Sequence, residues 1–368
     1  MTGGLPAVRS GDFLGVGHHV ALVEGAPEAV AAAVAEAAAD REPLHVSVHA
    51  GTPAERDKAT AALREAGIRC AVDALVQPPA GAGCAAVLWA VTGDGTVRHP
   101  APGTSRLDFA GGSLVRLGHL EPGAATGWAE LTGRLRGLGL GLDQVWKTWS
   151  YLPVRPGREE AAAEFVAFNL DRAEVFGDTT FRLEPPAVAD RAYPANTGVA
   201  DLSGTGTLTG IAGRAAGGVR VLGVENRRQR PPHRYGPGTG RPRPAQFSRA
   251  VLLAGRGRGL ALMAGTAAVV ESSTVGTDAA EQLDVTLGIV DGLLSAGAAT
   301  AGGLTLAGGL ESLLHLVVYV ARAGDLDRVR QRVAERVPVP ALTVLAPLTR
   351  ADLLVEVDGL AVVEVRDG

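Results

Sequence analysis

The hydrophobic pattern is clearest in two stretches that share one order of elements. In the first, the spacing of apolar residues predicts a helix, a strand and a second helix, over residues 128–138, 143–152 and 159–176. In the second, the same order recurs with two closing strands, over residues 282–294, 313–320, 325–336, 338–345 and 353–357. Each central strand carries a tyrosine near its end, Tyr151 or Tyr319. The repeat predicts an internal duplication of one α+β unit.

The last predicted strand, Leu353–Val357, holds one carboxylate among four apolar residues. A carboxylate held against apolar neighbours loses hydration, and its pKa rises. Glu356 is therefore a candidate general acid that stays protonated near pH 7. The alternative is an edge strand on which Glu356 faces solvent.

The first 122 residues show a weaker pattern. They predict a strand, a helix and a strand, over residues 45–49, 56–66 and 85–91. Further along, glycines between short apolar runs predict hairpins at 204–206 and 255–259. We interpret a GxGxxG-like spacing among these glycines as turns, because a dinucleotide site needs a helix after it and strands flank both sides here.

Composition excludes several classes of protein. The net charge is -4 at pH 7, so no broad basic field is present to attract nucleic acid or an anionic membrane. Cys70 and Cys84 lack metal-ligand spacing, which favours a reducing cytoplasm over a disulfide framework. We find no signal peptide and no apolar run of transmembrane length, and we expect neither a metal nor a cofactor. The length of 368 residues predicts about two domains, divided as residues 1–190 and 191–368.

Residues 225–249 form the most unusual stretch, rich in arginine and proline between two predicted strands. A connection of this length without regular structure is more often functional than decorative. Arginine binds planar carboxylates through two parallel hydrogen bonds. The alternatives are a solvated flexible loop, or a phosphate or nucleic-acid contact; the negative net charge and the few aromatic residues speak against nucleic acid.

The motifs in this stretch resemble those of the chorismatase family. An ENRRQ sequence begins at Glu225 and is followed by Tyr235-Gly236-Pro237 and Phe247-Ser248-Arg249-Ala250. Other matching segments are Trp149-Ser150-Tyr151, Phe168 with Arg172, Pro194–Gly198, Gly265-Thr266-Ala267, Gln282 with Thr286-Leu287, and the final Leu353–Glu356. Each motif alone is weak, but their order over about residues 125–360 is fairly specific.

The resemblance implies two domains similar to the RidA/YjgF (reactive-intermediate deaminase) fold, with mixed sheets, helices on one face and a site fed by both halves. By resemblance, Glu356 occupies the position of the catalytic acid and Arg249 that of a carboxylate-binding arginine. The other implied substrate-binding positions are Tyr235, Arg172, Asn226 and Arg228. Two further positions, which separate hydrolysing from aromatising members, are occupied here by Ala250 and Thr349.

Three departures mark the chain as a divergent member. Arg227 stands where members have proline, and residues 169–171 replace a Cys-x-Gly sequence. Residues 270–276 contain no histidine, whereas members carry a His-Glu-Ser-x-His run there. The resemblance therefore leaves open a rebuilt site or a changed substrate range.

The implied reaction is cleavage of the enolpyruvyl ether of chorismate, a dicarboxylate, to pyruvate and a dihydroxycyclohexadiene carboxylate, in secondary metabolism. Ala250 favours this hydrolysis over formation of 3-hydroxybenzoate, whereas Thr349 matches neither branch. The alternatives are another enolpyruvyl or dicarboxylate substrate on the same scaffold, and a non-catalytic binding protein. We expect a monomer or a homotrimer, with no nucleic-acid or membrane partner.

Overall fold

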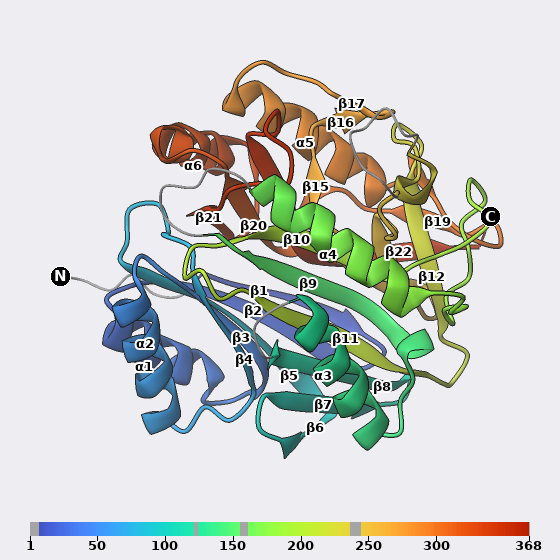
Figure 1. Cartoon of the computed structure of the whole chain (residues 1–368). Helices are drawn as coiled ribbons and strands as arrows, with labels where there is room; N and C mark the ends of the chain where they lie inside the picture. The colour runs from blue at the N-terminus through green and yellow to red at the C-terminus, as the bar shows by residue number, and fades with distance from the viewer. Residues whose placement is uncertain (1–6, 121–123, 155–160, 236–243, 368) are drawn as a thin grey trace.

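A computed structural model describes residues 7–120, 124–154, 161–235 and 244–367 of the chain. These residues form three large sheets, and helices cover the outer face of each one (Figure 1). The predicted α+β class, with mixed sheets and helices on one face, is confirmed. No helix in the described ranges is long and apolar enough to cross a membrane.

The first sheet has the strand order β1-β2-β5-β3-β4. Its strands are β1 (Ala7–Phe13), β2 (Val16–Gly25), β3 (Glu42–Ala50), β4 (Ala71–Val76) and β5 (Cys84–Gly93), and its helices are α1 (Pro27–Ala38) and α2 (Pro53–Glu65).

The second sheet has the order β10-β9-β11-β8-β7-β6. Its strands are β6 (Thr96–Ala101), β7 (Thr104–Phe109), β8 (Gly112–Leu120), β9 (Val145–Pro153), β10 (Ala195–Asp201) and β11 (Thr207–Ala215), with helices α3 (Ala124–Gly137) and α4 (Ala161–Phe176).

The third sheet has the order β18-β12-β13-β14-β22-β20-β21, and β15 and β19 also pair with β22. Its main strands are β12 (Arg220–Asn226), β13 (Ala250–Ala254), β14 (Arg258–Met263), β20 (Leu313–Val320), β21 (Ala341–Leu345) and β22 (Val355–Arg366). Its short strands are β15 (Thr266–Ala267), β18 (Ala298–Ala299) and β19 (Thr305–Ala307), and its helices are α5 (Ala279–Leu293) and α6 (Leu326–Arg336). A separate pair, β16 (Val269–Val270) and β17 (Ser273–Thr274), lies outside the three sheets.

The predicted repeat occurs three times. The orders α1-β3-α2-β4, α3-β9-α4-β10 and α5-β20-α6-β21 are equivalent, and in each copy the two strands pair in parallel across a helical connection. Two of these helices begin at side-chain caps: Thr52 accepts a hydrogen bond from the Glu55 amide, and Asp278 accepts from Ala280 and Glu281. Such caps stabilise a helix by about 1 kcal/mol.

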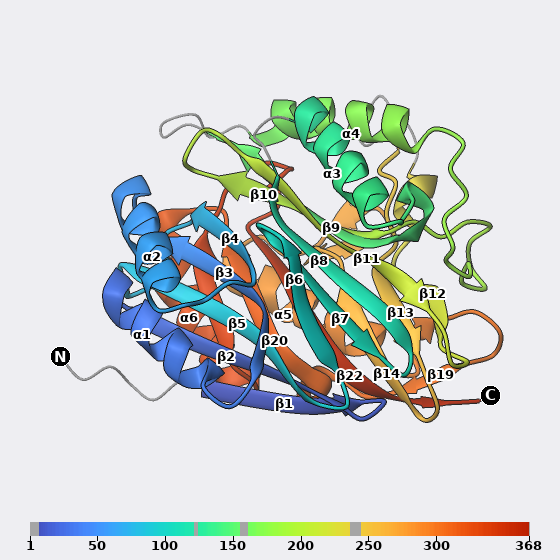
Figure 2. The same ribbon diagram turned by 90° about the horizontal axis from the view of Figure 1, so that it is seen from below.

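The inner faces of the three sheets pack on one another, with the helices outside (Figure 2). Trp89, Leu114 and Leu262, one from each sheet, belong to this shared core. The division expected between residues 190 and 191 stays a prediction. The pairing of strands groups the chain differently, since β10 and β11 join β9 in the second sheet.

Two local predictions need correction. The glycines at 204–206 do not close a hairpin, because β9 lies between β10 and β11. The predicted last strand is the start of a longer one: β22 runs from Val355 to Arg366 between β14 and β20. Glu356 is therefore on a central strand and only 7% exposed, so the alternative of a solvent-facing edge position is wrong. The hairpin at 255–259 is confirmed as β13–β14, with Gly257 at φ +71°.

Candidate active site

A pocket of about 60 Å³ lies between the second and third sheets. Residues of both sheets line it, together with loops around residues 247–249 and 349–353; the lining residues are Phe165, Asn196, Gly198, Tyr235, Phe247, Arg249, Gly265, Ala267, Val269, Thr349, Arg350, Leu353 and Glu356. The loop that carries Thr349 is held against β10, because the Ala200 amide donates to the Pro347 carbonyl at 3.0 Å. We call this space the Glu356 pocket.

Glu356 reaches the pocket because of its place on β22. Its backbone pairs with Ala267 on one side and with Tyr319 on the other. A β-carbon at Gly265 would lie 1.9 Å from the Glu356 Oε1 atom, so only glycine fits beside the carboxyl group. The Gly265 amide donates to the Asn196 carbonyl at 3.1 Å, which fixes this close approach.

Arg249 supplies a cation at the wall of the same pocket. It is 4% exposed, and its guanidinium donates a hydrogen bond to the hydroxyl of Tyr235. The guanidinium carbon lies 5.4 Å from the ring centre of Phe247 and 5.8 Å from that of Tyr235. These two rings and the hydrogen bond orient the guanidinium, and cation–π attraction of this kind stabilises a desolvated cation.

The structure brings together four of the predicted site residues in the pocket lining: Glu356, Arg249, Tyr235 and Thr349. The other four, Arg172, Asn226, Arg228 and Ala250, are outside that lining.

The side chains of these four residues have different surroundings. Arg172 is buried on α4, where it donates to the side chain of Asn169. Asn226 donates to the Ile289 carbonyl at 2.7 Å and accepts from the Arg228 amide at 2.8 Å, and the Arg228 side chain is exposed. Ala250 packs in the apolar cluster under α5. Residues 236–243 of the arginine-rich stretch lie outside the described residues.

Sequence reasoning missed Arg350 as a lining residue. It follows Thr349 directly, but its side chain is already paired with Asp352, at 3.0 and 2.6 Å. Asn196 was noticed only as part of a motif; its Oδ1 accepts hydrogen bonds from Thr148 and Ser150, at 2.9 and 3.0 Å. No sequence signal identifies either contact, because the partners are distant along the chain or follow from the loop conformation.

The segment that lacks the expected histidines begins beside the pocket wall, and residues 270–276 are not in the described lining. Val269, in strand β16, lines the pocket just before this segment. The chain then turns at Glu271, whose φ is +54°, and its backbone pairs with residues 228–230. In the described lining, this part of the wall is therefore apolar.

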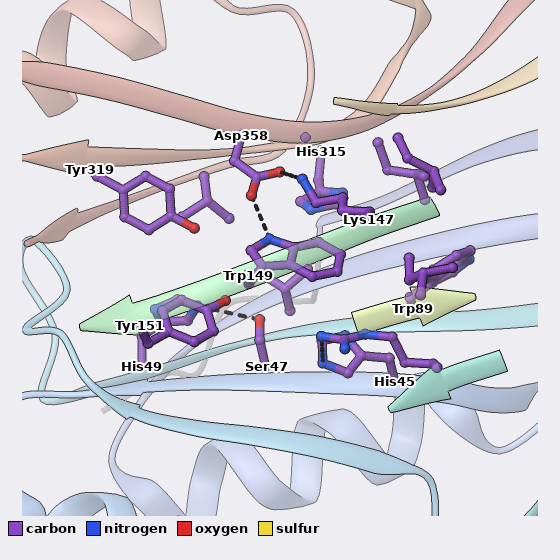
Figure 3. A pocket seen from close by; sticks show the side chains of 17 residues that line it. His45, Ser47, His49, Trp89, Lys147, Trp149, Tyr151, His315, Tyr319 and Asp358 are labelled. Carbon is purple, nitrogen blue, oxygen red and sulfur yellow. Dashed lines mark hydrogen bonds and ion pairs between the residues drawn. The ribbon is translucent and has the colours of Figure 1, made fainter. Parts of the chain in front are cut away.

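A polar network lies behind Glu356, two residues further along β22. Asp358 pairs with Lys147 at 2.9 Å and accepts a hydrogen bond from Trp149 at 2.5 Å (Figure 3). It also accepts a hydrogen bond from Thr197 at 2.6 Å. Burial lowers the pKa of Lys147, and the charge of Asp358 opposes that change. Lys147, Trp149 and Asp358 of this network line a second cavity.

The second cavity, of about 50 Å³, lies at the centre of the three sheets, and we call it the central pocket. Corresponding strands of the three copies each point three side chains into it: His45, Ser47 and His49 from β3, Lys147, Trp149 and Tyr151 from β9, and His315, Val317 and Tyr319 from β20 (Figure 3). Its two cations already have carboxylate partners, Lys147 with Asp358 and Arg116 with Asp73. We therefore regard the central pocket as the polar centre of the fold.

No family model matches the chain. In architecture, the protein is similar to a crystal structure of chorismatase, with a TM-score of 0.62, 20% identity, and coverage of 87% of this chain and 93% of that one. This likeness establishes the shared fold.

Two curated proteins of Streptomyces hygroscopicus are similar in sequence. One, named chorismatase, is 30% identical over 225 residues, which cover 60% of this chain and 62% of the relative. This chain is therefore similar to a chorismatase in sequence, as it is in fold. The other, named 3-hydroxybenzoate synthase, is 28% identical over 232 residues, which cover 60% of this chain and 64% of the relative. The chain thus spans less than two thirds of the length of these two relatives.

Proposed function

We propose that the chain cleaves the enolpyruvyl ether of chorismate in the Glu356 pocket. The observation that carries this proposal is the presence of a buried carboxyl group and a buried guanidinium group, Glu356 and Arg249, in the wall of one pocket. Chorismate has two carboxylates and an enol ether, so its cleavage calls for a cationic anchor and an acid. The names of the two curated relatives support this substrate class.

In the proposed reaction, Glu356 donates its proton to the terminal methylene carbon of the enolpyruvyl group. The electrons of the carbon–carbon double bond form the new C–H bond, which leaves an oxocarbenium ion at the ether carbon. Water adds to that carbon and gives up a proton, which restores Glu356. The bond between the hemiketal carbon and the ring oxygen then breaks, as the hemiketal hydroxyl loses its proton and the ring oxygen gains one. This step releases pyruvate and a dihydroxycyclohexadiene carboxylate.

Hydrolysis is the product type that we propose, because Ala250 matches the hydrolysing branch and the Thr349 hydroxyl is far less acidic than a thiol. Formation of 3-hydroxybenzoate is the second candidate, since one relative carries that activity in its name. The absence of the expected histidines from residues 270–276, beside the apolar wall at Val269, keeps a different enolpyruvyl or dicarboxylate substrate as a further alternative. A cytoplasmic location, and a monomer or homotrimer, also remain proposals.

Incubation with chorismate tests the function, with pyruvate followed by coupled reduction to lactate and the ring product identified by chromatography. We expect pyruvate and the dihydroxycyclohexadiene carboxylate in equal amounts. Glu364→Gln is a suitable control for Glu356→Gln, because Glu364 is an exposed carboxylate on the same strand, β22. Its side chain is paired with Arg366 at 3.0 Å. Chorismate that binds without release of pyruvate would indicate a non-catalytic binding protein, and 3-hydroxybenzoate as the main product would overturn the proposed product.

A further inference from the structure

We propose that Glu225 positions the Arg249 guanidinium and, by gaining or losing its own proton, decides whether that guanidinium is available to a substrate carboxylate. This inference rests on the proposed function, in which Arg249 anchors a carboxylate. It assigns a role to a buried acidic side chain that the reaction itself does not use.

The pairing of strands places the two side chains against each other. In the antiparallel pair β12–β13, Gly223 lies opposite Val251 and Val224 lies opposite Ala250. The next step of this register brings Glu225 opposite Arg249, and directly opposed residues point to the same face of a sheet. The Arg249 backbone is held there, because its carbonyl accepts from the Ala264 amide at 2.8 Å.

The contact between the two groups is unusual for a buried acid and base. Glu225 is 0% exposed, and its Oε2 lies 4.0 Å from the Arg249 Nε atom. Charge-assisted hydrogen bonds normally bring such atoms to about 2.7–2.9 Å. Within the described parts of the chain, neither side-chain oxygen of Glu225 makes a well-aligned hydrogen bond, and neither does the Arg249 Nε; the Arg249 backbone amide is close enough to act on the carboxyl group. A buried polar group left in this state costs free energy, so its presence calls for an explanation.

Arg249 is the charged group that acts on Glu225 among the described residues. Strand β18 places Ala299 opposite Glu225. The carboxylates of α5, which packs on β12, have partners elsewhere: Glu281 with Thr277, Asp284 with Arg332, and Asp291 with the Leu310 amide. The protonation of Glu225 is therefore set by burial and by Arg249.

Burial raises the pKa of Glu225 to about 8, while the Arg249 charge and backbone amide act in the opposite direction. Below this pH the carboxyl group is neutral, and the guanidinium presents its full charge to the Glu356 pocket. Above it, the ionised carboxylate neutralises the guanidinium and competes with the substrate. If only the protonated form binds, the apparent Kd rises in proportion to the loss of that form, about tenfold between pH 7 and pH 9.

Calorimetric titration of chorismate into a Glu356→Gln background, in which turnover should be about 100- to 10,000-fold slower, tests this inference. We expect the Kd to rise about tenfold from pH 7 to pH 9, and the rise to disappear when Glu225→Gln is added. Adding Glu364→Gln instead, at an exposed glutamate, should leave the rise in place. An affinity that does not change with pH, or an equal rise with and without Glu225→Gln, would overturn the inference.

Failure of the proposed substrate is distinguishable from failure of this inference. If chorismate binds at no pH, the proposed substrate is wrong. The titration of the Glu225 carboxyl group then tests whether Glu225 and Arg249 are coupled. Carboxyl ¹³C resonances of the ligand-free protein should include one glutamate that titrates near pH 8, is lost in Glu225→Gln, and moves to a higher midpoint in Arg249→Gln. Absence of that resonance, or a midpoint unaffected by Arg249→Gln, would overturn the inference without reference to any ligand.

Discussion

Replacement of Lys147 by methionine tests how strongly the polar centre of the three sheets stabilises the fold. The side chain is 1% exposed, and its ammonium group pairs with Asp358 at 2.9 Å. It also donates to the Thr197 hydroxyl at 3.2 Å and to the Met263 carbonyl. Methionine fills most of the same volume without the charge, so the Asp358 carboxylate is left without its cation.

Removal of one partner from a buried ion pair destabilises a protein by about 3–5 kcal/mol. Asp358 would keep its hydrogen bonds from Trp149 and Thr197, at 2.5 and 2.6 Å, and these stabilise the remaining charge. Burial also lowers the pKa of Lys147, which means that the folded protein already bears part of the cost of this charge. We therefore expect a loss at the lower end, about 3 kcal/mol.

Urea unfolding of Lys147→Met, Asp358→Asn and the double variant measures this free energy. The double variant should lose less than the sum of the two single variants, because each single change leaves one buried polar group unpaired. Lys58→Met is the matched control, since Lys58 is the other lysine of the chain and its pair with Glu28 is exposed. We expect the control to be indistinguishable from the parent. A Lys147→Met variant as stable as the parent, or strictly additive losses, would refute the reasoning.

Three further predictions concern pH, binding and site geometry. Burial lowers the pKa of His18 to about 3 and that of His49 to about 4, so the unfolded chain binds more protons than the folded protein below pH 6.5. The free energy of unfolding should therefore be highest above that pH and fall by up to roughly 1.4 kcal/mol per histidine for each pH unit below it. Urea midpoints that stay constant from pH 7 to pH 5 would contradict this prediction. Arg249→Lys should weaken chorismate binding about 10- to 100-fold with little change in Tm, since lysine keeps the charge but loses the planar fork, whereas unchanged affinity with a collapsed Tm would make Arg249 a structural residue. Gly265→Ala should displace the Glu356 carboxyl group, which lies 1.9 Å from the new β-carbon, and reduce kcat about 100-fold; a variant with parental kcat would remove this contact from the account.

The sequence was sufficient to predict a strand or helix where a long periodic pattern of apolar residues indicates it. Strand β20 and helices α5 and α6 match the predicted elements within a few residues. The apolar neighbours of Glu356 left its burial as one of two alternatives, and the structure confirms that alternative. These features depend on spacing along the chain, which the amino-acid sequence displays directly.

The rest depends on contacts between distant segments. The extent of β22 was missed because Asp358 and Gly359 interrupt its apolar run, and Asp358 is tolerated there only because Lys147 arrives from β9. The third copy of the repeat was missed because only its β3 and α2 were predicted, and neither α1 nor β4 was. Substrate binding by Arg172 and Asn226 was implied only by the resemblance and stays a prediction; in the structure Arg172 donates to Asn169 on the same helix, and Asn226 donates to the Ile289 carbonyl.

The most direct test of the account is the deuterium content of the pyruvate methyl group after reaction with chorismate in D₂O, with immediate reduction of pyruvate to lactate to prevent exchange. Proton donation by Glu356 to the methylene carbon predicts a single deuterium in that methyl group. Glu356→Gln should lower the rate about 100- to 10,000-fold, because an amide cannot supply the proton. Unlabelled pyruvate, or a Glu356→Gln variant within a few-fold of the parent, would contradict the central claim.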